Sequence, residues 1–156
     1  GMRVGFACGT ELLLQKMVVA KQVEDVHTNQ FFQMLCTRYL QTCDLNEHIA
    51  GIRVLYREKC EQMLLALERY MPSYVEYTRP EGGLFLWCTL PPSLSMPEVV
   101  KAAAERKVFV VAGTAFNCDT QAPSSSFRLN YSMPTAEEIN KGISLLADVI
   151  CAQSSM

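Results

Sequence analysis

The sequence predicts an α+β protein: a helical first half, then a small, mostly antiparallel sheet with helices packed on one face. Two observations indicate this class. Apolar residues recur at helical spacing as far as residue 70, and after Pro72 the pattern changes to short alternating or apolar runs separated by turns. The chain has 156 residues, of which 49% are hydrophobic and 19% charged, so it can bury one sizeable core.

The first half is expected to be helical after a short opening strand. The expected elements are a strand over residues 2–8 and helices over residues 10–20, 26–40 and 45–70. Asp44 and Glu47 have the spacing of a capping box, in which each side chain accepts a hydrogen bond from the other residue's backbone N–H at the start of a helix. Pro72 ends the longest helix.

The second half alternates strands and helices. The expected strands cover residues 74–78, 84–90, 108–113 and 127–131, and the expected helices cover residues 96–106 and 135–150. Ser95 with Glu98, and Thr135 with Glu138, repeat the capping-box spacing at the two helix starts. The final six residues, CAQSSM, are expected to fray.

Charge and hydropathy exclude several classes of partner. The formal net charge is −2, and no basic run stands out, so we expect no nucleic-acid partner and no binding to an anionic membrane. No apolar stretch approaches the roughly 20 residues of a membrane span, and no signal-peptide pattern is seen. The sequence therefore predicts a cytoplasmic protein.

Seven cysteines are scattered singly along the chain, with no C-x-x-C pair and only two histidines to join them. Zinc sites usually show closely spaced cysteine and histidine pairs, and a disulfide framework usually has an even number of cysteines. We expect free, buried thiols in a reducing compartment and no metal site.

The first residues are unusual for a complete domain. The strand over residues 2–8 has helices as its sequence neighbours, and a lone strand leaves backbone groups unpaired. Gly1 before Met2 also resembles the scar of a removed expression tag. A chain that begins inside a strand is expected to be truncated.

A single arginine, Arg128, lies in the apolar strand over residues 127–131. A guanidinium there can pair with an internal glutamate, lie at a sheet edge, or bind a ligand. Its planar fork can form two parallel hydrogen bonds to a carboxylate, which lysine cannot do.

Four sequence blocks resemble a known family. They are GMRVGFACG at 1–9, RPEGGLFLWCTLP at 79–91, RKVFVVAGTAFN at 106–117 and FRLNYSMPTAEEINKGISLLADVI at 127–150. In this order they resemble the C-terminal part of fold-type I, pyridoxal-phosphate-dependent aminotransferases of classes I and II, in the aminoadipate/kynurenine aminotransferase and regulator-fused branch. The resemblance covers essentially the whole chain.

The resemblance implies a domain division. Residues 1–9 correspond to an orphan strand of the large cofactor-binding domain, residues 10–43 to connecting helices, and residues 44–151 to the small C-terminal domain.

The resemblance also assigns candidate binding residues. Arg128 matches the family arginine that holds the substrate's α-carboxylate, and Arg3 matches the arginine that binds the cofactor phosphate. The turn at Gly82 and Gly83 approaches the mouth of the family's active site, although a plain hairpin turn explains it equally well. Phe116 matches a position near the substrate entrance, with an apolar core role as the alternative.

The family's catalytic lysine has no counterpart in this sequence. Transamination needs a lysine that forms a Schiff base with the cofactor. The six lysines are Lys16, Lys21, Lys59, Lys101, Lys107 and Lys141, and none precedes Arg3 in the family context. We therefore assign no catalytic residue and expect the chain alone to bind no pyridoxal phosphate, although the parent family uses it with an amino acid and a 2-oxo acid.

Three hypotheses remain open at this point. The chain is a fragment of an aminotransferase that is inactive alone, a free-standing ligand-binding or interaction module that uses Arg128, or the effector domain of an aminotransferase-like transcriptional regulator. Because the resemblance implies a dimeric parent enzyme, we also expect a homo-oligomer that associates through residues 2–40.

Overall fold

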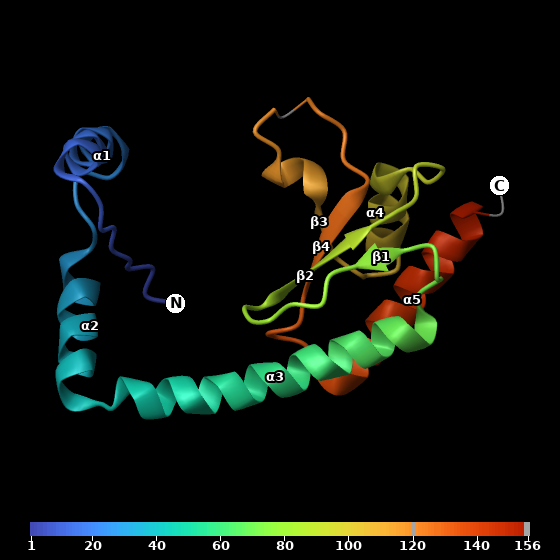
Figure 1. The fold of residues 1–156 in the computed structure, drawn as a ribbon, viewed down its shortest axis with the longest axis horizontal. Coiled ribbons are helices and arrows are strands. Elements are labelled where there is room, and N and C mark those ends of the chain that lie inside the picture. The colour runs from blue at the N-terminus through green and yellow to red at the C-terminus, as the bar shows by residue number, and fades with distance from the viewer. Residues whose placement is uncertain (120, 155–156) are drawn as a thin grey trace. The chain divides into compact units, whose positions relative to one another are not determined.

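The computed structural model describes residues 1–119 and 121–154, and the chain divides into two compact units, Gly1–Ala50 and Gly51–Met156. The element order along the chain is helical first and mixed afterwards, as Figure 1 shows by colour. The predicted α+β class, with a small antiparallel sheet, is confirmed.

The first unit is helical. It holds α1 (Glu11–Glu24), α2 (Gln30–Thr42) and the beginning of α3 (Leu45–Tyr70). Asn29 begins α2 because its side chain accepts a hydrogen bond from the N–H of Phe32 at 3.2 Å. Neither α1 nor α2 contains a fully buried residue, and most of their apolar side chains are exposed.

Residues 2–8 differ from the predicted strand. Residues 1–10 contain no regular secondary structure, and Arg3 has a positive φ of 56°. A strand is stabilised by hydrogen bonds to a neighbouring strand. Among the described residues all four strands lie in the second unit and pair with one another, which leaves this segment without a partner.

The second unit is built on one antiparallel sheet. Its strands are β1 (Glu76–Tyr77), β2 (Phe85–Thr89), β3 (Val111–Ala112) and β4 (Ser126–Asn130), in the order β1-β2-β4-β3 (Figure 1). Helix α4 (Met96–Glu105) links β2 to β3, a short 3-10 helix η1 (Gly113–Phe116) follows β3, and α5 (Ala136–Ser154) ends the described chain.

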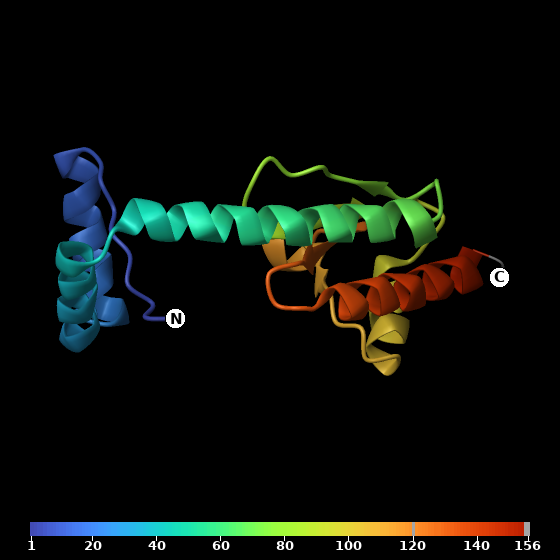
Figure 2. The same ribbon diagram turned by 90° about the horizontal axis from the view of Figure 1, so that it is seen from below.

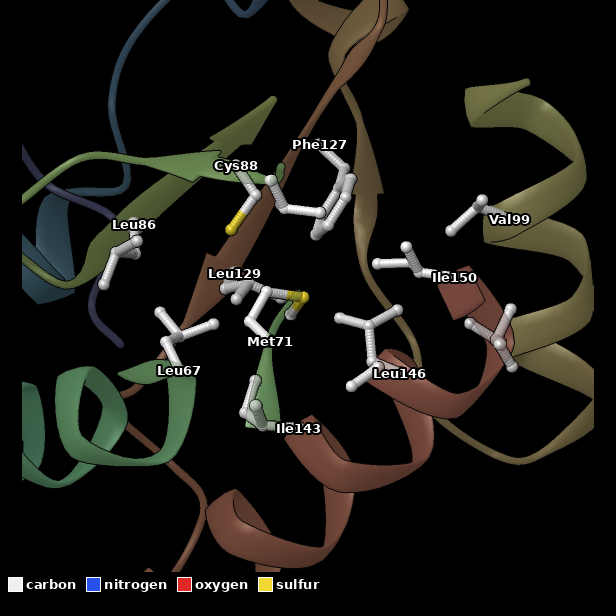
Figure 3. Packing of buried hydrophobic residues seen from close by; sticks show 14 of the residues in the cluster. Leu67, Met71, Leu86, Cys88, Val99, Phe127, Leu129, Ile143, Leu146 and Ile150 are labelled. Atoms are coloured by element: carbon white, nitrogen blue, oxygen red, sulfur yellow. The ribbon is translucent and has the colours of Figure 1, made fainter. Parts of the chain in front are cut away.

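The core lies on one face of this sheet. Leu86 and Cys88 of β2 and Phe127 and Leu129 of β4 point into it, as Figure 3 shows, because alternate residues of a strand face the same side. The helices α3, α4 and α5 supply most of the remaining buried side chains, and the later part of α3 lies beside α5 in both ribbon views (Figures 1 and 2). The predicted inward stripe of α5 is confirmed: Ile139, Ile143, Leu146, Ala147 and Ile150.

Several boundaries differ from the sequence prediction. The strand predicted over residues 108–113 shrinks to two residues, and Phe109 is 81% exposed instead of buried. The tail predicted to fray from residue 151 remains helical to Ser154, while residues 155–156 lie outside the described part of the chain.

The three predicted capping boxes have different outcomes in the structure. Thr135 and Glu138 form the complete reciprocal pair, since each side chain accepts the other's backbone N–H, at 3.2 and 2.8 Å. Asp44 accepts hydrogen bonds from Asn46 and Glu47. Ser95 precedes α4 without a side-chain capping bond, so the box predicted there is wrong.

The cysteine prediction holds for one position. Cys88 is buried, and its apolar surroundings raise the pKa of its thiol to about 12 because burial disfavours the thiolate. Cys36 and Cys60 are half-buried, whereas the other four are exposed: Cys8, Cys43, Cys118 and Cys151.

None of the helices in the described ranges is both long enough and apolar enough to cross a bilayer.

Candidate functional site

Arg128 lies in the middle of the sheet, on the face opposite the core. Its neighbours in β4, Phe127 and Leu129, are buried in the core, so the pleat directs Arg128 to the other side. Its cross-strand partners are Trp87 in β2 and Val111 in β3. The guanidinium is therefore carried by a central strand that is hydrogen-bonded on both sides.

Aromatic rings surround this guanidinium. The Cζ atom of Arg128 lies 3.8 Å from the centroid of the Phe85 ring and 4.8 Å from that of Phe116. Trp87 meets Phe116 edge-on, with centroids 5.4 Å apart and an interplanar angle of 74°. Both phenylalanines are within the range of a cation–π contact, which attracts a cation to a ring face.

Arg128 has no acidic partner among the described residues. Its Nε is buried without a hydrogen-bond partner, whereas Arg79 pairs with Glu68, and Arg106 lies 3.7 Å from Asp148. A buried donor without a partner is costly, because it has lost its hydrogen bonds to water. An internal ion pair, one of the alternatives left open by the sequence, is therefore not what the structure shows.

The turn before β2 fixes the position of Phe85. Gly83 has φ of +86°, a conformation that favours glycine. The hydroxyl of Tyr131 donates to the carbonyl of Gly83 at 2.9 Å, and the Tyr131 N–H donates to Leu84 O at 3.2 Å. Burial, followed by the nearby Cys60 thiol, raises the pKa of Tyr131 to about 12, so this hydroxyl stays a donor at neutral pH.

A close backbone approach fixes the position of Phe116. A Cβ added to Gly113 would lie 2.3 Å from Ser124 Oγ and 2.6 Å from the carbonyl oxygen of Ser126, so a larger residue does not fit without movement. Gly113 begins η1, and Phe116 is the last residue of that turn. The glycine thus lets η1 pack against the start of β4, the strand that carries Arg128.

Phe116 and Phe85 belong to the candidate site together with Arg128. Phe116 is 47% exposed and contacts Arg128, so it lies at the candidate site and not in the core. The sequence prediction named no role for Phe85 or Trp87. The signal was present in the alternation of β2, where Leu86 and Cys88 face the core, so that Phe85 and Trp87 face the other side.

Arg3 belongs to the first unit, whereas Arg128 belongs to the second. It is exposed and makes no ion pair with any described residue. A free guanidinium fits the chemistry of a phosphate dianion, which accepts charge-assisted hydrogen bonds. Arg3 can therefore contribute one cation to a phosphate site.

A groove of about 820 Å³ lies beneath the Gly82–Gly83 turn. It does not include Arg128; its lining includes Arg53, Tyr56, Cys60 and Tyr131. We place the candidate site on the sheet face instead, because Arg128 supplies a fixed cation without a counter-charge there. No cluster of three potential metal ligands occurs in residues 1–119 and 121–154.

Comparison with known proteins finds one family along nearly the whole chain. The model of the family "Aminotransferase class I and II" matches residues 1–146. The chain is 35% identical over 150 residues to aromatic-amino-acid aminotransferase 1 of Thermococcus litoralis, covering 96% of this chain and 36% of that protein. It is 39% identical over 143 residues to 2-aminoadipate transaminase of Thermus thermophilus, covering 92% of this chain and 36% of that protein.

The fold also matches the solved structure of an aminotransferase. The alpha-aminoadipate aminotransferase LysN of Thermus thermophilus, complexed with N-(5'-phosphopyridoxyl)-L-leucine, superposes with a TM-score of 0.88 at 36% sequence identity. The match covers 99% of this chain and 39% of that one. The chain therefore spans little more than a third of the length of the proteins it matches.

Proposed function

Because the chain belongs to the class I and II aminotransferases, we propose that it forms the carboxylate-binding part of a pyridoxal-phosphate-dependent aminotransferase. Enzymes of this family transfer an amino group between an amino acid and a 2-oxo acid. Both substrates carry a carboxylate next to the reacting carbon. A fixed cation that holds this carboxylate orients the substrate for reaction.

The main support for this proposal is the position of Arg128 and its lack of an acidic partner among the described residues. A guanidinium on a central strand, stacked on Phe85 and without an acidic partner among the described residues, offers its hydrogen bonds to an external anion. The planar fork of arginine matches a carboxylate with two parallel hydrogen bonds. We assign Arg128 the role of holding the α-carboxylate.

The family cofactor, pyridoxal phosphate, supplies an electron sink for this chemistry when it is bound. Arg3 is the residue that we assign to its phosphate, because its guanidinium is exposed and makes no ion pair in the described chain. None of the six lysines of this chain matches the family's cofactor-binding lysine. We propose that these 156 residues, taken alone, neither retain the cofactor nor transaminate.

The domain division is part of the same proposal. We assign residues 1–9 to the large cofactor-binding domain, residues 10–43 to connecting helices and residues 44–151 to the small C-terminal domain. The compact unit from Gly51 onward supports the last assignment, and the absence of buried residues in α1 and α2 supports the second. Limited proteolysis that cuts first within residues 10–43 is expected, whereas early cleavage within the sheet would contradict the division.

A ligand-binding module or a regulator's effector domain is the less favoured alternative. The identities of 35% and 39% with proteins named as aminotransferases extend over more than nine-tenths of this chain. These identities support the interpretation that the chain is part of an enzyme, and not a free-standing module.

We also propose a homo-oligomer and a cytoplasmic location. Cell fractionation tests the location, and recovery of the protein with a membrane or secreted fraction would contradict it.

The experiment that tests the proposal is a titration of the 156-residue chain with 2-oxoglutarate, followed by NMR of the arginine side chains. One hydrogen bond to a charged group contributes about 1.5–3 kcal/mol, and because association itself costs free energy, we expect weak binding by the pair, with a Kd on the order of 10 mM. We expect a saturable shift of the Arg128 signals. The Arg128→Lys variant should lose the saturable binding, because lysine cannot form the two parallel bonds.

The matched control is Arg106→Lys, because Arg106 is exposed and lies at 3.7 Å from Asp148, away from the aromatic rings around Arg128. This variant should bind 2-oxoglutarate like the unmodified chain. Equal binding by the Arg128→Lys variant and the unmodified chain would contradict the assigned role of Arg128.

A further inference from the structure

Both phenylalanine rings near Arg128 restrict how a ligand can approach it. The Phe85 centroid lies 3.8 Å from Cζ, which is stacking distance, and the Phe116 centroid lies 4.8 Å from it. A guanidinium is planar, and its hydrogen-bond donors point outward in that plane. Rings that pack on the guanidinium leave its edges as the places where an anion can bind.

One of these edges is closed. The Nε atom of Arg128 is buried, and it is the one guanidinium nitrogen of this residue found both buried and without a partner in the described chain. The terminal Nη1 and Nη2 groups also make no hydrogen bond in the described chain, but unlike Nε they are not among its buried atoms without a partner. The end of the guanidinium that carries Nη1 and Nη2 is therefore the edge that a ligand can reach.

We propose that Phe85 and Phe116 are positioning residues that hold the Arg128 guanidinium in one plane, so that it receives a carboxylate end-on through its two terminal amino groups. This inference rests on the proposed function of Arg128 and adds to it the residues that set its pose. A guanidinium held in place loses less conformational freedom when the ligand binds, so less of the binding free energy is lost to ordering.

The backbone holds both rings in place independently of the ligand. Phe85 follows the turn that Tyr131 fixes through the carbonyl of Gly83, at 2.9 Å. Phe116 ends η1, which packs against β4 at Gly113, and its ring is braced by Trp87. The fold therefore sets the backbone position of both phenylalanines without a ligand.

The experiment is an NMR titration of the 156-residue chain with acetate, the simplest carboxylate, in the unmodified chain and in the Phe85→Leu and Phe85→Tyr variants. Leucine keeps an apolar side chain at this position but removes the ring face, whereas tyrosine keeps the face. A cation–π contact of this kind corresponds to roughly a three- to tenfold change in an equilibrium constant. We expect acetate binding to weaken by that factor in Phe85→Leu and to be kept in Phe85→Tyr.

A second readout separates positioning from a general loss of structure. Rotation about the Cζ–Nε bond carries the Nη groups out of the plane and into the space that the rings occupy. We expect this rotation to be slow in the unmodified chain and faster in Phe85→Leu, as measured by exchange between the Nη signals of Arg128. A shift on acetate binding that is larger at Nη than at Nε supports the end-on geometry, and the reverse order overturns it.

The matched control is Phe109→Leu, the same substitution at a phenylalanine that is 81% exposed and just before β3. It should leave acetate binding unchanged. Phe116→Leu is the second test variant; its ring is half-exposed, so this change keeps the test decisive if Phe85→Leu does not fold.

The outcomes separate the two proposals. If Arg128→Lys and the unmodified chain bind acetate equally, the role of Arg128 fails, and the positioning role fails with it. If acetate binding depends on Arg128 but is unchanged in Phe85→Leu and Phe116→Leu, the positioning role alone is overturned.

Discussion

Glu138 stabilises the start of α5 through its charge. Its carboxylate accepts a hydrogen bond from the backbone N–H of Thr135 at 2.8 Å, and the Thr135 hydroxyl accepts one from the N–H of Glu138 at 3.2 Å. The backbone hydrogen bond to Thr135 is the main reason that the pKa of Glu138 is lowered. Hydrogen bonds to the charged form make the carboxylate the stabilising state.

This arrangement predicts a dependence of stability on pH. The folded pKa lies below the unfolded one, so the unfolded chain binds more protons in this range and the stabilisation is lost as the pH falls through the folded pKa. In Glu138→Gln the amide oxygen can still accept the Thr135 N–H, but it does not titrate. We expect the free energy of unfolding of the unmodified chain, measured with urea, to fall more steeply below about pH 5 than that of Glu138→Gln. Parallel pH profiles for the two proteins would contradict this assignment.

The sequence predicted the position of Arg128 better than its surroundings. Its place in the strand over residues 127–131 was predicted, and strand alternation puts Arg128 on the face opposite to that of Phe127 and Leu129. Its contacts with Phe85 and Phe116 depend instead on the register of β2 against β4 and on a 3-10 turn after β3. Neither follows from local spacing, because both are set by long-range pairing.

Long amphipathic helices were predicted well and short strands less well. The predicted bounds of α3, residues 45–70, are those observed, since its apolar stripe extends over many turns. The strand over residues 108–113 was overestimated, because its apolar run resembles a buried strand whereas Phe109 is exposed. An apolar run shows that residues can be buried, but the number of paired residues depends on the neighbouring strand.

Helix starts show the same limit. Thr135 with Glu138 and Ser95 with Glu98 have identical spacing, but only the first pair forms the predicted reciprocal bonds. Pro97 occupies the first turn of α4, and a proline there presets the helical φ without a side-chain cap. A capping-box spacing therefore predicts where a helix starts more reliably than it predicts the hydrogen bonds there.

The first unit exposes an unusual amount of apolar surface. Twelve large apolar side chains of residues 6–40 are exposed: Phe6, Leu12, Leu13, Met17, Val18, Val19, Val23, Val26, Phe31, Met34, Leu35 and Leu40. Exposed apolar surface of this extent is typical of an interface. In our proposal, residues 2–40 associate with other copies of this chain.

Sedimentation velocity tests this association. We expect the average mass of the unmodified chain to rise above that of the monomer as its concentration increases. The double variant Val19→Gln, Phe31→Gln removes apolar surface without changing the net charge, and it should shift the distribution toward the monomer. Phe109→Gln is the control, because it removes an exposed ring from the second unit. A monomeric unmodified chain at high concentration would contradict the proposal.

We propose that this chain holds the carboxylate-binding arginine of an aminotransferase but not the amine that anchors the cofactor. The most direct measurement is the visible absorbance of the 156-residue chain after mixing with pyridoxal phosphate and extensive dialysis, compared with an unrelated protein of similar lysine content. We predict that both lose the cofactor's absorbance equally, because none of the six lysines occupies the family position. Stoichiometric absorbance that survives dialysis and disappears when a single lysine is replaced would contradict the claim.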